Sequence, residues 1–353
     1  MPSSGKGLRE RLANGEVVLA AEGYLFEMER RGYLKAGPFV PECVLEHPDL
    51  VQELSEEFVH AGSDVVLAFT YYGHREKLRL IGRENDLEAL NKKALEIAKT
   101  VAQKHGKLLA GNICNSTSYD PNDSAKVEEC KRMFKEQTEW AVSAGVDFVV
   151  AETYSDLGEA ILAVEAVKQY GQGTPIVVCF APNTSLKTRD GYAYDEACRQ
   201  LEAAGADVVG LNCSSGPDTI IEMMKSIRQA VNIPLACLPV PYRTTETAKQ
   251  FQSLLLPDGK RAFFEDLDCF LCPQSDFDRF AKSCKELNIQ YVGICCGNSS
   301  RYFRRLAMAM GCIPPAARYT TDMSLHWVYG DKAKFSSYHT ETLRKLNSPT
   351  ETA

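Results

Sequence analysis

Two adjacent cysteines end an apolar run in the stretch 290–300, QYVGICCGNSS. The run predicts a buried strand that carries Cys295 and Cys296 at its C-terminal tip. Adjacent side chains on a strand point to opposite faces, so both thiols can reach one metal ion only if the strand breaks there. Gly297 allows this break, because glycine adopts backbone conformations that other residues avoid.

A third thiol, Cys213, ends the similar segment DVVGLNC at 207–213, which also runs into a Gly-Pro turn. Three cysteines at two strand ends fit a zinc site with an open fourth position, as in catalytic zinc sites. Thiolates favour zinc over magnesium or calcium. We therefore predict that Cys213, Cys295 and Cys296 bind Zn²⁺. The alternative is three unconnected core thiols, since cysteine is common in buried strands, but the two matching strand ends favour the metal.

An all-sulfur ligand set donates much charge to the metal and makes it a weak Lewis acid. Such a zinc ion is better suited to hold a substrate thiol as a thiolate than to make hydroxide from water. The bound thiol would lose its proton near neutral pH, because the charge of the metal favours the anion. These three residues therefore predict an activated thiol nucleophile.

Other polar and aromatic residues stand at predicted strand ends. Glu152 ends a buried segment, where a carboxylate is unfavourable unless it is paired. We predict that it binds a substrate ammonium; the alternative is an ion pair with a barrel lysine or arginine. Phe39, Tyr71 and Tyr72 follow strands rather than lie within them, and aromatic faces attract sulfonium or quaternary ammonium groups. We predict that they form an aromatic cage for such a group, although aromatic residues are also common in cores.

The pair Cys269 and Cys272 forms a Cys-x-x-Cys motif, which often indicates zinc or redox chemistry. Apolar residues surround the pair in LDCFLCP at 267–273, and no second pair follows. We therefore interpret this motif as structural.

Eight apolar segments alternate with amphipathic helices along the chain. Continuous apolar strands separated by helices predict a parallel sheet covered by helices. Eight such units in succession predict an α/β fold, a closed (β/α)8 TIM barrel, in which chemistry belongs at the C-terminal ends of the strands. The predicted strands are 16–21, 64–70, 108–114, 147–153, 175–181, 207–213, 234–241 and 290–297. The predicted helices are 48–60, 86–105, 125–143, 158–170, 194–203, 218–231, 276–287 and 300–310.

Three helix-to-strand joints share one pattern: AGSD at 61–64, AGVD at 144–147 and AGAD at 204–207. Each places glycine where a helix end needs a left-handed residue. We interpret these joints as structural elements at the opposite end of the barrel from the chemistry.

We predict one barrel domain over residues 7–316. It is interrupted by an insertion at about 242–275, which we expect to cover part of the barrel mouth. Residues 317–353 follow no barrel pattern and are predicted to form a C-terminal arm or tail, frayed after about Asn347.

The 353-residue chain is 44% hydrophobic and carries a net charge of −7 without a basic run, which argues against a nucleic-acid partner. Its N-terminus has no apolar segment of a signal peptide, and no uncharged stretch has the roughly 18 residues of a membrane span. We expect no membrane association and a cytoplasmic location. The thirteen cysteines are spread along the chain, many in apolar segments, and are predicted to be free thiols.

With these residues assembled, the chain resembles the homocysteine S-methyltransferase family, above all its betaine–homocysteine branch, over about residues 7–316. The most specific matches are GLNC ending at Cys213, GICCG at 293–297 and ERRGYLKAGPF at 29–39. The resemblance implies that the three cysteines bind zinc, which activates homocysteine for attack on a methyl group of an onium donor. It further implies that Glu152 binds the amine and Tyr72 faces the onium, while Phe39 replaces a tryptophan of the branch.

We therefore predict methyl transfer from glycine betaine to homocysteine, forming methionine. S-methylmethionine or dimethylsulfoniopropionate is the alternative donor, because Phe39 is a smaller cage wall than tryptophan. A non-catalytic zinc-thiolate sensor of metal or redox state and a metal-free lyase with two glutamates as acid and base are further alternatives. The predicted partners are a small-molecule thiol and an onium methyl donor.

The sequence departs from the family at several positions. The family's Asp-Gly-Gly after the first strand reads Ala21-Glu22-Gly23 here, so Glu22 and Gly23 are expected on the homocysteine side, with Glu22 supplying the carboxylate. Leu67 and Ala68 replace polar residues of the betaine branch. The chain stops before that branch's long C-terminal oligomerisation extension, so a tetramer is not assumed, and a homo-oligomer of other size stays open.

Overall fold

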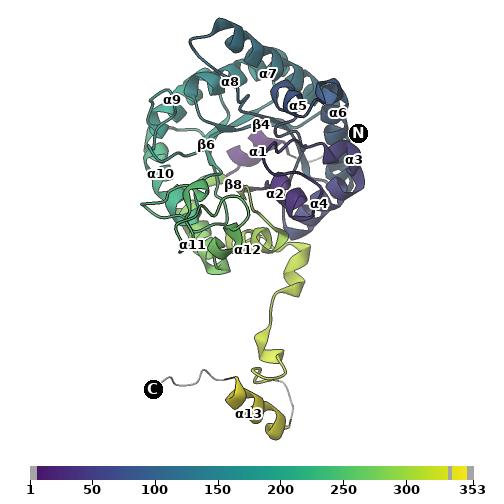
Figure 1. Ribbon diagram of the computed structural model, residues 1–353, viewed down its shortest axis with the longest axis vertical. Coiled ribbons are helices and arrows are strands. Elements are labelled where there is room, and N and C mark those ends of the chain that lie inside the picture. Colours follow the sequence, from purple (N-terminus) through teal and green to yellow (C-terminus); the bar gives the residue numbers. More distant parts are fainter. Residues whose placement is uncertain (1–5, 333–335, 348–353) are drawn as a thin grey trace. The chain divides into compact units, whose positions relative to one another are not determined.

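Eight parallel strands form a closed barrel in chain order, as predicted (Figure 1). The computed structural model describes residues 6–332 and 336–347. Nearly every strand residue is buried, which explains the continuous apolar runs: parallel strands are covered on both faces. The strands are β1 (Val18–Ala21), β2 (Val65–Leu67), β3 (Leu108–Cys114), β4 (Phe148–Tyr154), β5 (Ile176–Phe180), β6 (Val208–Asn212), β7 (Leu235–Leu238) and β8 (Ile289–Ile294).

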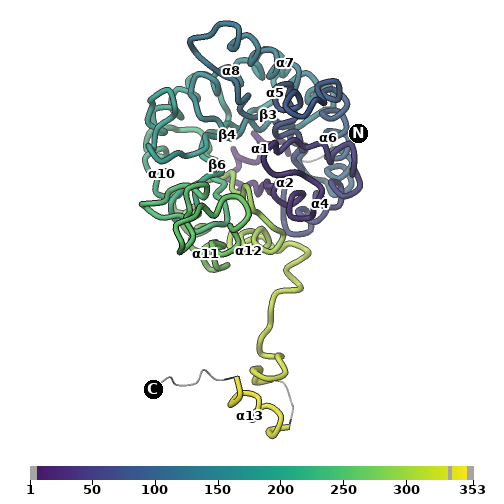
Figure 2. Tube along the Cα trace, in the orientation of Figure 1, coloured from purple at the N-terminus to yellow at the C-terminus, as the bar shows by residue number. Residues whose placement is uncertain are grey.

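Helices form a ring around the strands, and Figure 2 follows the strand-helix units once around the barrel. Eight of these helices match the predicted ones within two residues at each end. The helices of the barrel unit are α1 (Leu8–Ala13), α2 (Tyr24–Arg30), α3 (Cys43–Glu46), α4 (Pro48–Ala61), α5 (Arg75–Leu80), α6 (Leu87–His105), α7 (Ser124–Ala144), α8 (Leu157–Tyr170), α9 (Tyr194–Ala204), α10 (Pro217–Ala230), α11 (Gln274–Glu286) and α12 (Ser300–Met310).

The second strand is shorter than the predicted 64–70. After Leu67 the chain turns, with the Thr70 N–H donating to the Ala68 carbonyl at 2.8 Å and the Gly73 N–H to the Thr70 carbonyl at 2.8 Å. The residues that follow Leu67 are buried in a loop, so the apolar run in the sequence extends beyond the end of the strand. The sequence also missed the short helices α2 and α5, which lie in loops after β1 and β2 and are too short to give a clear helical period.

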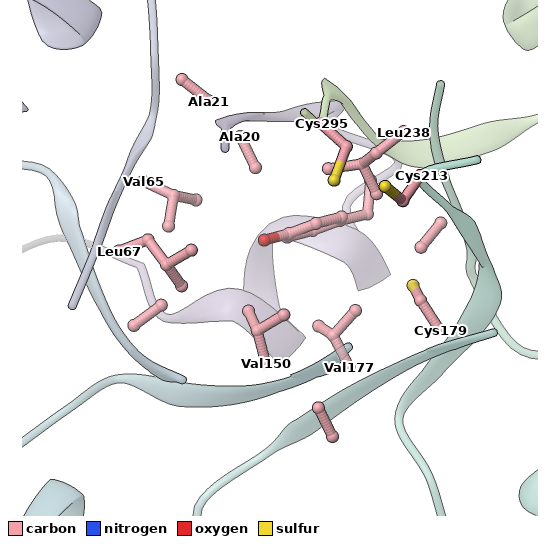
Figure 3. Packing of buried hydrophobic residues seen from close by; sticks show 14 of the residues in the cluster. Ala20, Ala21, Val65, Leu67, Val150, Val177, Cys179, Cys213, Leu238 and Cys295 are labelled. Carbon is pink, nitrogen blue, oxygen red and sulfur yellow. The ribbon is translucent and has the colours of Figure 1, made fainter. Parts of the chain in front are cut away.

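The interior of the barrel is filled by side chains from successive strands (Figure 3). Val65, Val150, Val177 and Leu238 point inward from β2, β4, β5 and β7. All four are at most 2% exposed. The barrel centre is therefore a packed core, and a substrate site can form only above it, at one end.

The three repeated joints lie where the prediction placed them, between a helix and the next strand. Gly62, Gly145 and Gly205 end α4, α7 and α9 in the left-handed conformation, with φ of 118°, 80° and 98°. The aspartate two residues later then bonds to the preceding strand in both directions. For example, the Asp147 N–H donates to the Leu109 carbonyl at 2.8 Å, and the Asp147 carboxylate accepts the Leu109 N–H at 2.7 Å.

The same exchange recurs at the two other joints. The carboxylate of Asp64 accepts the Leu19 N–H at 3.1 Å, and that of Asp207 accepts the Ile176 N–H at 2.9 Å. The two hydrogen bonds of each aspartate fix the start of an even-numbered strand to the odd-numbered strand before it, at the N-terminal end of the barrel. This explains why the sequence repeats Gly-x-Asp.

The segment between β7 and α11 contains no α-helix or regular strand. It holds two short 3₁₀ turns, Phe251–Ser253 and Leu267–Phe270. The Phe251 N–H donates to the Ser214 carbonyl at 2.8 Å, directly after Cys213. The insertion therefore contacts the loop after β6, at the C-terminal end of the strands.

The chain divides into two compact units, Met1–Pro314 and Pro315–Ala353. The second unit contains two 3₁₀ turns, Pro315–Tyr319 and Met323–Leu325, and the helix α13 (Ser337–Leu346). The tail residues after 347, which the sequence predicted to be frayed, lie outside the described residues. In the part of the chain that the structure describes, no helix combines the length and apolarity needed to span a membrane.

We expect Asp147→Ala to lower the free energy of unfolding by about 1–3 kcal/mol, because the buried Leu109 N–H loses its acceptor. Asp147→Asn keeps an oxygen acceptor and should lose less. Urea unfolding measures both variants. The joint lies at the far end of the barrel from the strand tips, so each variant should keep the wild-type activity at a temperature where it is folded. An undiminished stability of Asp147→Ala would contradict the proposed role.

Candidate active site

The three predicted metal ligands converge at the C-terminal ends of two strands. Cys213 directly follows β6, and Cys295 and Cys296 directly follow β8. Their sulfur atoms all lie within 4.8 Å of one another, and those of Cys295 and Cys296 are 3.9 Å apart. Figure 3 labels Cys213 and Cys295, whose side chains point toward the same part of the barrel interior. The structure thus brings the thiol that follows β6 together with the two that follow β8, far along the chain.

The backbone turns sharply at both cysteine segments, so that the thiols face the same point. Strand β8 ends at Ile294, and Gly297 has a φ of 88°. A Cβ atom on Gly297 would lie 2.5 Å from the Tyr242 hydroxyl, so this position requires glycine for both its conformation and its space. Cys213 itself has a φ of 63°, a strained conformation of the kind that clusters at functional sites.

The three thiols share protons. Hydrogen bonds from the thiols of Cys295 and Cys296 lower the pKa of Cys213 well below its ordinary value. The same contacts raise the pKa of the two donor thiols, with burial as a further cause for both. Within the cluster the thiolate form is therefore favoured at Cys213 over the other two positions, and a cation that binds all three sulfurs must displace the protons that remain.

A pair of buried carboxyl groups lies beside the thiols. Glu22 follows β1 and Glu152 lies near the end of β4; each is 3% exposed. A carboxyl oxygen of each lies within 4.8 Å of the other and of the Cys295 sulfur. One carboxyl oxygen of Glu22 has no hydrogen-bond partner. An unpartnered buried carboxyl oxygen of this kind indicates a position for a ligand donor.

Burial raises the pKa of both glutamates. For Glu22 the negative charge of Glu152 adds to this effect, and for Glu152 a hydrogen bond from Asn112 partly offsets it, leaving a pKa of about 7. Among residues 6–332 and 336–347, no lysine or arginine forms an ion pair with either carboxyl. The barrel ion pair considered as an alternative for Glu152 is therefore absent, and a substrate cation would supply the missing partner.

Two amides hold Glu152 in place, and the sequence analysis assigned them no role. The side chain of Asn112 donates to one oxygen of Glu152, and that of Asn212 donates to the other at 2.9 Å. Asn212 also accepts the Thr153 N–H at 3.0 Å. Position gave a signal for Asn212 alone: it ends β6, and inward residues of alternate barrel strands such as β4 and β6 share one layer. Asn112 lies within β3, before its end at Cys114, and had no such signal.

A cavity connects the carboxyl pair to the thiols and to the loop after β2. It is lined by Glu22, Gly23, Leu67, Ala68, Tyr71, Glu152, Cys295 and Cys296, among others. Gly23 has a φ of 92°, and a Cβ atom there would lie 2.7 Å from the Cys295 carbonyl oxygen. Gly23 therefore allows the loop after β1 to pass directly over the cysteine segment.

The predicted aromatic residues lie in two groups. The ring centroids of Tyr71 and Tyr72 are 4.3 Å apart, and Tyr71 lines the cavity. Phe39 instead stacks on Phe26 at 6.0 Å and contacts Phe264 of the insertion at 5.3 Å. Within the described residues, no ring contact joins Phe39 to either tyrosine. The structure therefore groups the tyrosines with the cavity and Phe39 with an aromatic cluster next to it.

The Cys-x-x-Cys motif lies apart from these groups. Cys269 is exposed and Cys272 is buried, and neither belongs to a group of potential metal ligands within the described residues. The thiols of Cys114, Cys179, Cys198, Cys237 and Cys284 are buried and unpaired, as predicted.

The metal-free protein should lose stability as the pH rises through the titration of Glu152. Its folded pKa of about 7 lies above the ordinary value of 4.5. The folded form thus keeps a proton that the unfolded chain releases, and this contribution is complete below pH 4.5 and lost as the pH rises through about 7. We expect the free energy of unfolding of wild type, measured in urea with a chelator, to fall more between pH 5 and pH 8 than that of Glu152→Gln.

The exposed Glu88 on α6 offers a matched control for this experiment. Glu88→Gln should keep the pH dependence of wild type. An unchanged dependence in Glu152→Gln would contradict the assignment to the buried carboxyl.

Comparison with known proteins identifies the family. A model of the family described as homocysteine S-methyltransferase matches residues 23–310. Betaine–homocysteine S-methyltransferase 1 of Mus musculus is 33% identical over 326 residues, covering 88% of this chain and 77% of that protein. S-methylmethionine–homocysteine S-methyltransferase of Pongo abelii is 32% identical over 326 residues, covering 90% of this chain and 85% of that protein.

The fold has a solved counterpart. The metallated form of the homocysteine methyltransferase MmuM from Escherichia coli superposes with a TM-score of 0.67 at 17% identity, covering 85% of this chain and 99% of that one. This similarity confirms the barrel, and the family match and the sequence relatives establish the kinship. The chain belongs to the homocysteine S-methyltransferase family of enzymes.

Proposed function

We propose that this enzyme transfers a methyl group from glycine betaine to homocysteine, forming methionine, with a Zn²⁺ ion held by Cys213, Cys295 and Cys296. The observation that supports this most strongly is the convergence of three thiols next to a buried carboxyl pair that lacks a cation. A thiol substrate with an ammonium group complements both halves of this arrangement.

The residues present fit zinc. Zinc–thiolate bonds are about 2.3 Å long, so sulfurs at the corners of a tetrahedron are roughly 3.8 Å apart. The 3.9 Å between Cys295 and Cys296 and the limit of 4.8 Å for the whole group agree with this spacing. The metallated form of the Escherichia coli enzyme also supports a metal in this fold. When bound, zinc would lower the pKa of the substrate thiol so that it is a thiolate near neutral pH.

The carboxyl pair would hold the ammonium of homocysteine. The aspartate of the family's Asp-Gly-Gly motif falls at Ala21, so Glu22 supplies a carboxyl group one residue later in the chain. This carboxyl lies beside that of Glu152. An ammonium between them would lower their raised pKa values and ionise both, because an opposite charge favours the carboxylate. Asn112 and Asn212 keep Glu152 aimed at this position. The ammonium and the thiol group of one substrate would then be fixed together.

In the proposed reaction the homocysteine sulfur forms a bond to a methyl carbon of the donor. The bond from that carbon to the onium nitrogen breaks, and its electron pair stays on the nitrogen, which becomes a neutral amine. The thiol proton is released beforehand, so no side chain has to act as a base at the carbon. The cavity residues contribute chiefly by holding the two reactants in line, which can supply much of the rate.

The positive charge of the donor disappears during this transfer. Tyr71 and Tyr72 would bind the onium through cation–π attraction. The cage therefore binds the charged donor at least as strongly in the ground state as in the transition state, and such binding does not increase the rate of the chemical step. A small cage of two tyrosines, which binds the donor without holding it too tightly, suits this reaction.

A sulfonium donor, S-methylmethionine or dimethylsulfoniopropionate, is the second candidate. The relatives named for betaine and for S-methylmethionine have nearly the same identity to this chain, 33% and 32%. Phe39 packs with Phe26 and Phe264, and the apolar side chains of Leu67 and Ala68 line the cavity. The apolar wall formed by Leu67 and Ala68 would accept an uncharged sulfide leaving group as well as an amine.

We expect Cys296→Ser to abolish methionine formation and to bind less than one-tenth of the wild-type zinc, because loss of one thiolate removes a third of the ligand set. The assay combines homocysteine with glycine betaine, S-methylmethionine or dimethylsulfoniopropionate, with and without a chelator. A strong loss with the chelator and one preferred donor are expected. Cys269→Ser, at the exposed cysteine, is the control and should keep both zinc and activity.

Two results would overturn this proposal. Full activity after complete removal of zinc would favour the metal-free reaction with Glu22 and Glu152 as acid and base. Zinc binding without methyl transfer from any of the three donors would favour a metal or redox sensor.

Replacing Glu22 tests the ammonium site. Glu22→Gln removes one negative charge and should raise the KM for homocysteine roughly tenfold or more, since hydrogen bonds to charged groups contribute about 1.5–3 kcal/mol. The zinc content should stay at the wild-type level, because Glu22 is not among the thiol ligands. With 3-mercaptopropionate-type thiols, which lack the ammonium, wild type and Glu22→Gln should perform alike; an equal loss with both thiols would contradict the role.

A further inference from the structure

Lys77 occupies an unusual position in the loop region above β1 and β2. It lies on the short helix α5, and its side chain is half-buried. Its ammonium nitrogen is 4.0 Å from the centroid of the Tyr72 ring and 3.3 Å from the Pro38 carbonyl oxygen. The lysine therefore places a positive charge on a tyrosine that is expected to face an onium ion.

This charge has no counter-ion in the described part of the chain. The neighbouring arginines of the same helix are paired: Arg75 with Glu136 at 2.8 Å, and Arg79 with Glu76. For Lys77, between them, the polar contacts found in the described residues are those with the Pro38 carbonyl oxygen and the Tyr72 ring. Burial lowers its pKa, which reflects the free-energy cost of leaving the charge unpaired. A partly buried cation without a partner indicates a place for an anionic ligand group.

Lys77 is close enough to the cavity to meet such a group. Tyr71 lines the cavity together with Cys296, and its ring centroid is 4.3 Å from that of Tyr72. The Lys77 nitrogen thus lies within about 8 Å of the Tyr71 ring centroid. An onium centre and a carboxylate separated by one to three carbon atoms are roughly 3–5 Å apart. A donor of this size can therefore contact the tyrosines with one end and approach Lys77 with the other.

We propose that Lys77 binds the carboxylate of the methyl donor, so that the enzyme uses zwitterionic onium donors and discriminates against onium ions that have no carboxylate. This inference rests on the proposed function and adds a specificity-determining residue to it. An onium ion without an anionic group would be repelled by the lysine ammonium, whereas the carboxylate of a zwitterion would form a charge-assisted hydrogen bond with it.

The loop of Tyr72 is held by contacts other than the one with Lys77, so its conformation does not depend on the lysine alone. The Tyr72 N–H donates to the Cys114 sulfur at 3.3 Å. The side chain of the buried Asn91 donates to the Gly73 carbonyl at 2.7 Å. These bonds should keep Tyr72 in its left-handed conformation, with a φ of 59°, when the lysine is changed.

The test compares glycine betaine with glycine betaine amide, in which a neutral carboxamide replaces the carboxylate and the trimethylammonium group is kept. Dimethylsulfoniopropionate and its amide form a second pair. Wild type should prefer each zwitterion by at least tenfold in kcat/KM. Lys77→Met should lower kcat/KM for the zwitterions about 10–100-fold, mainly through KM. It should leave kcat/KM for the amides equal or higher, because the repulsion between the lysine and their onium group is removed. Lys77→Arg should retain most of the preference.

Lys126→Met, on the exposed surface of α7, is the matched control for loss of one lysine charge and should leave both donors unaffected. Equal losses with zwitterion and amide in Lys77→Met would assign the lysine a positioning role only and overturn the inference. So would a wild-type enzyme that uses the amides as well as the zwitterions.

Equilibrium binding separates this inference from the proposed function. Each donor is titrated into zinc-loaded protein that contains homocysteine, and the dissociation constant is measured. Lys77→Met should bind glycine betaine more weakly than wild type does, but should not bind the amide more weakly. If wild type transfers no methyl group yet binds zwitterions in this lysine-dependent way, the proposed function fails and the carboxylate site stands. If transfer occurs and binding does not depend on Lys77, only the present inference fails.

Discussion

Closure of the parallel barrel is the constraint on which the candidate site depends. Because all eight strands run in one direction, their C-terminal ends meet around one opening. The side chains of Glu152, Asn212 and Cys295 come from β4, β6 and the end of β8, and alternate strands contribute to the same layer. A shift of one residue in any of these strands would turn its functional side chain to the opposite face. The aspartates at the far end of the barrel, which bond the chain entering β2, β4 and β6 to the strand before each, therefore also support the site.

The second constraint is electrostatic. The opening gathers two carboxyl groups and three thiols, all acids, without a basic side chain paired to the carboxyls in the described residues. The folded chain tolerates this because burial raises the pKa of the glutamates and the thiols share protons. Under the proposed function, these protons occupy the positions that a metal ion and a substrate ammonium would take. A metal ion at the sulfurs and an ammonium at the carboxyls would replace these protons, so occupancy should release acid and add stability.

The sequence predicted the barrel and the meeting of the three thiols because both depend on patterns along the chain: continuous apolar runs and the residues that end them. It did not predict the amides that orient Glu152, because their role depends on which strand ends share a layer. Nor did it separate Phe39 from Tyr71 and Tyr72, since Phe39 is drawn into a cluster with Phe264, more than two hundred residues away. The short β2 was missed for a related reason: burial in a loop and burial in a strand select the same apolar residues.

The two sides of the barrel opening also differ in charge. The acidic side, at Glu22, Glu152 and the thiols, attracts cations, and the side of Lys77 attracts anions. If the proposed function and the proposed role of Lys77 hold, a zwitterion between them would have one favourable orientation, with its onium end toward the sulfurs and its carboxylate toward the lysine. That orientation would present a methyl carbon to the thiolate, as an in-line displacement requires. Charge separation across the barrel mouth would thus select the donor and align it at the same time, and neither effect needs a large aromatic cage.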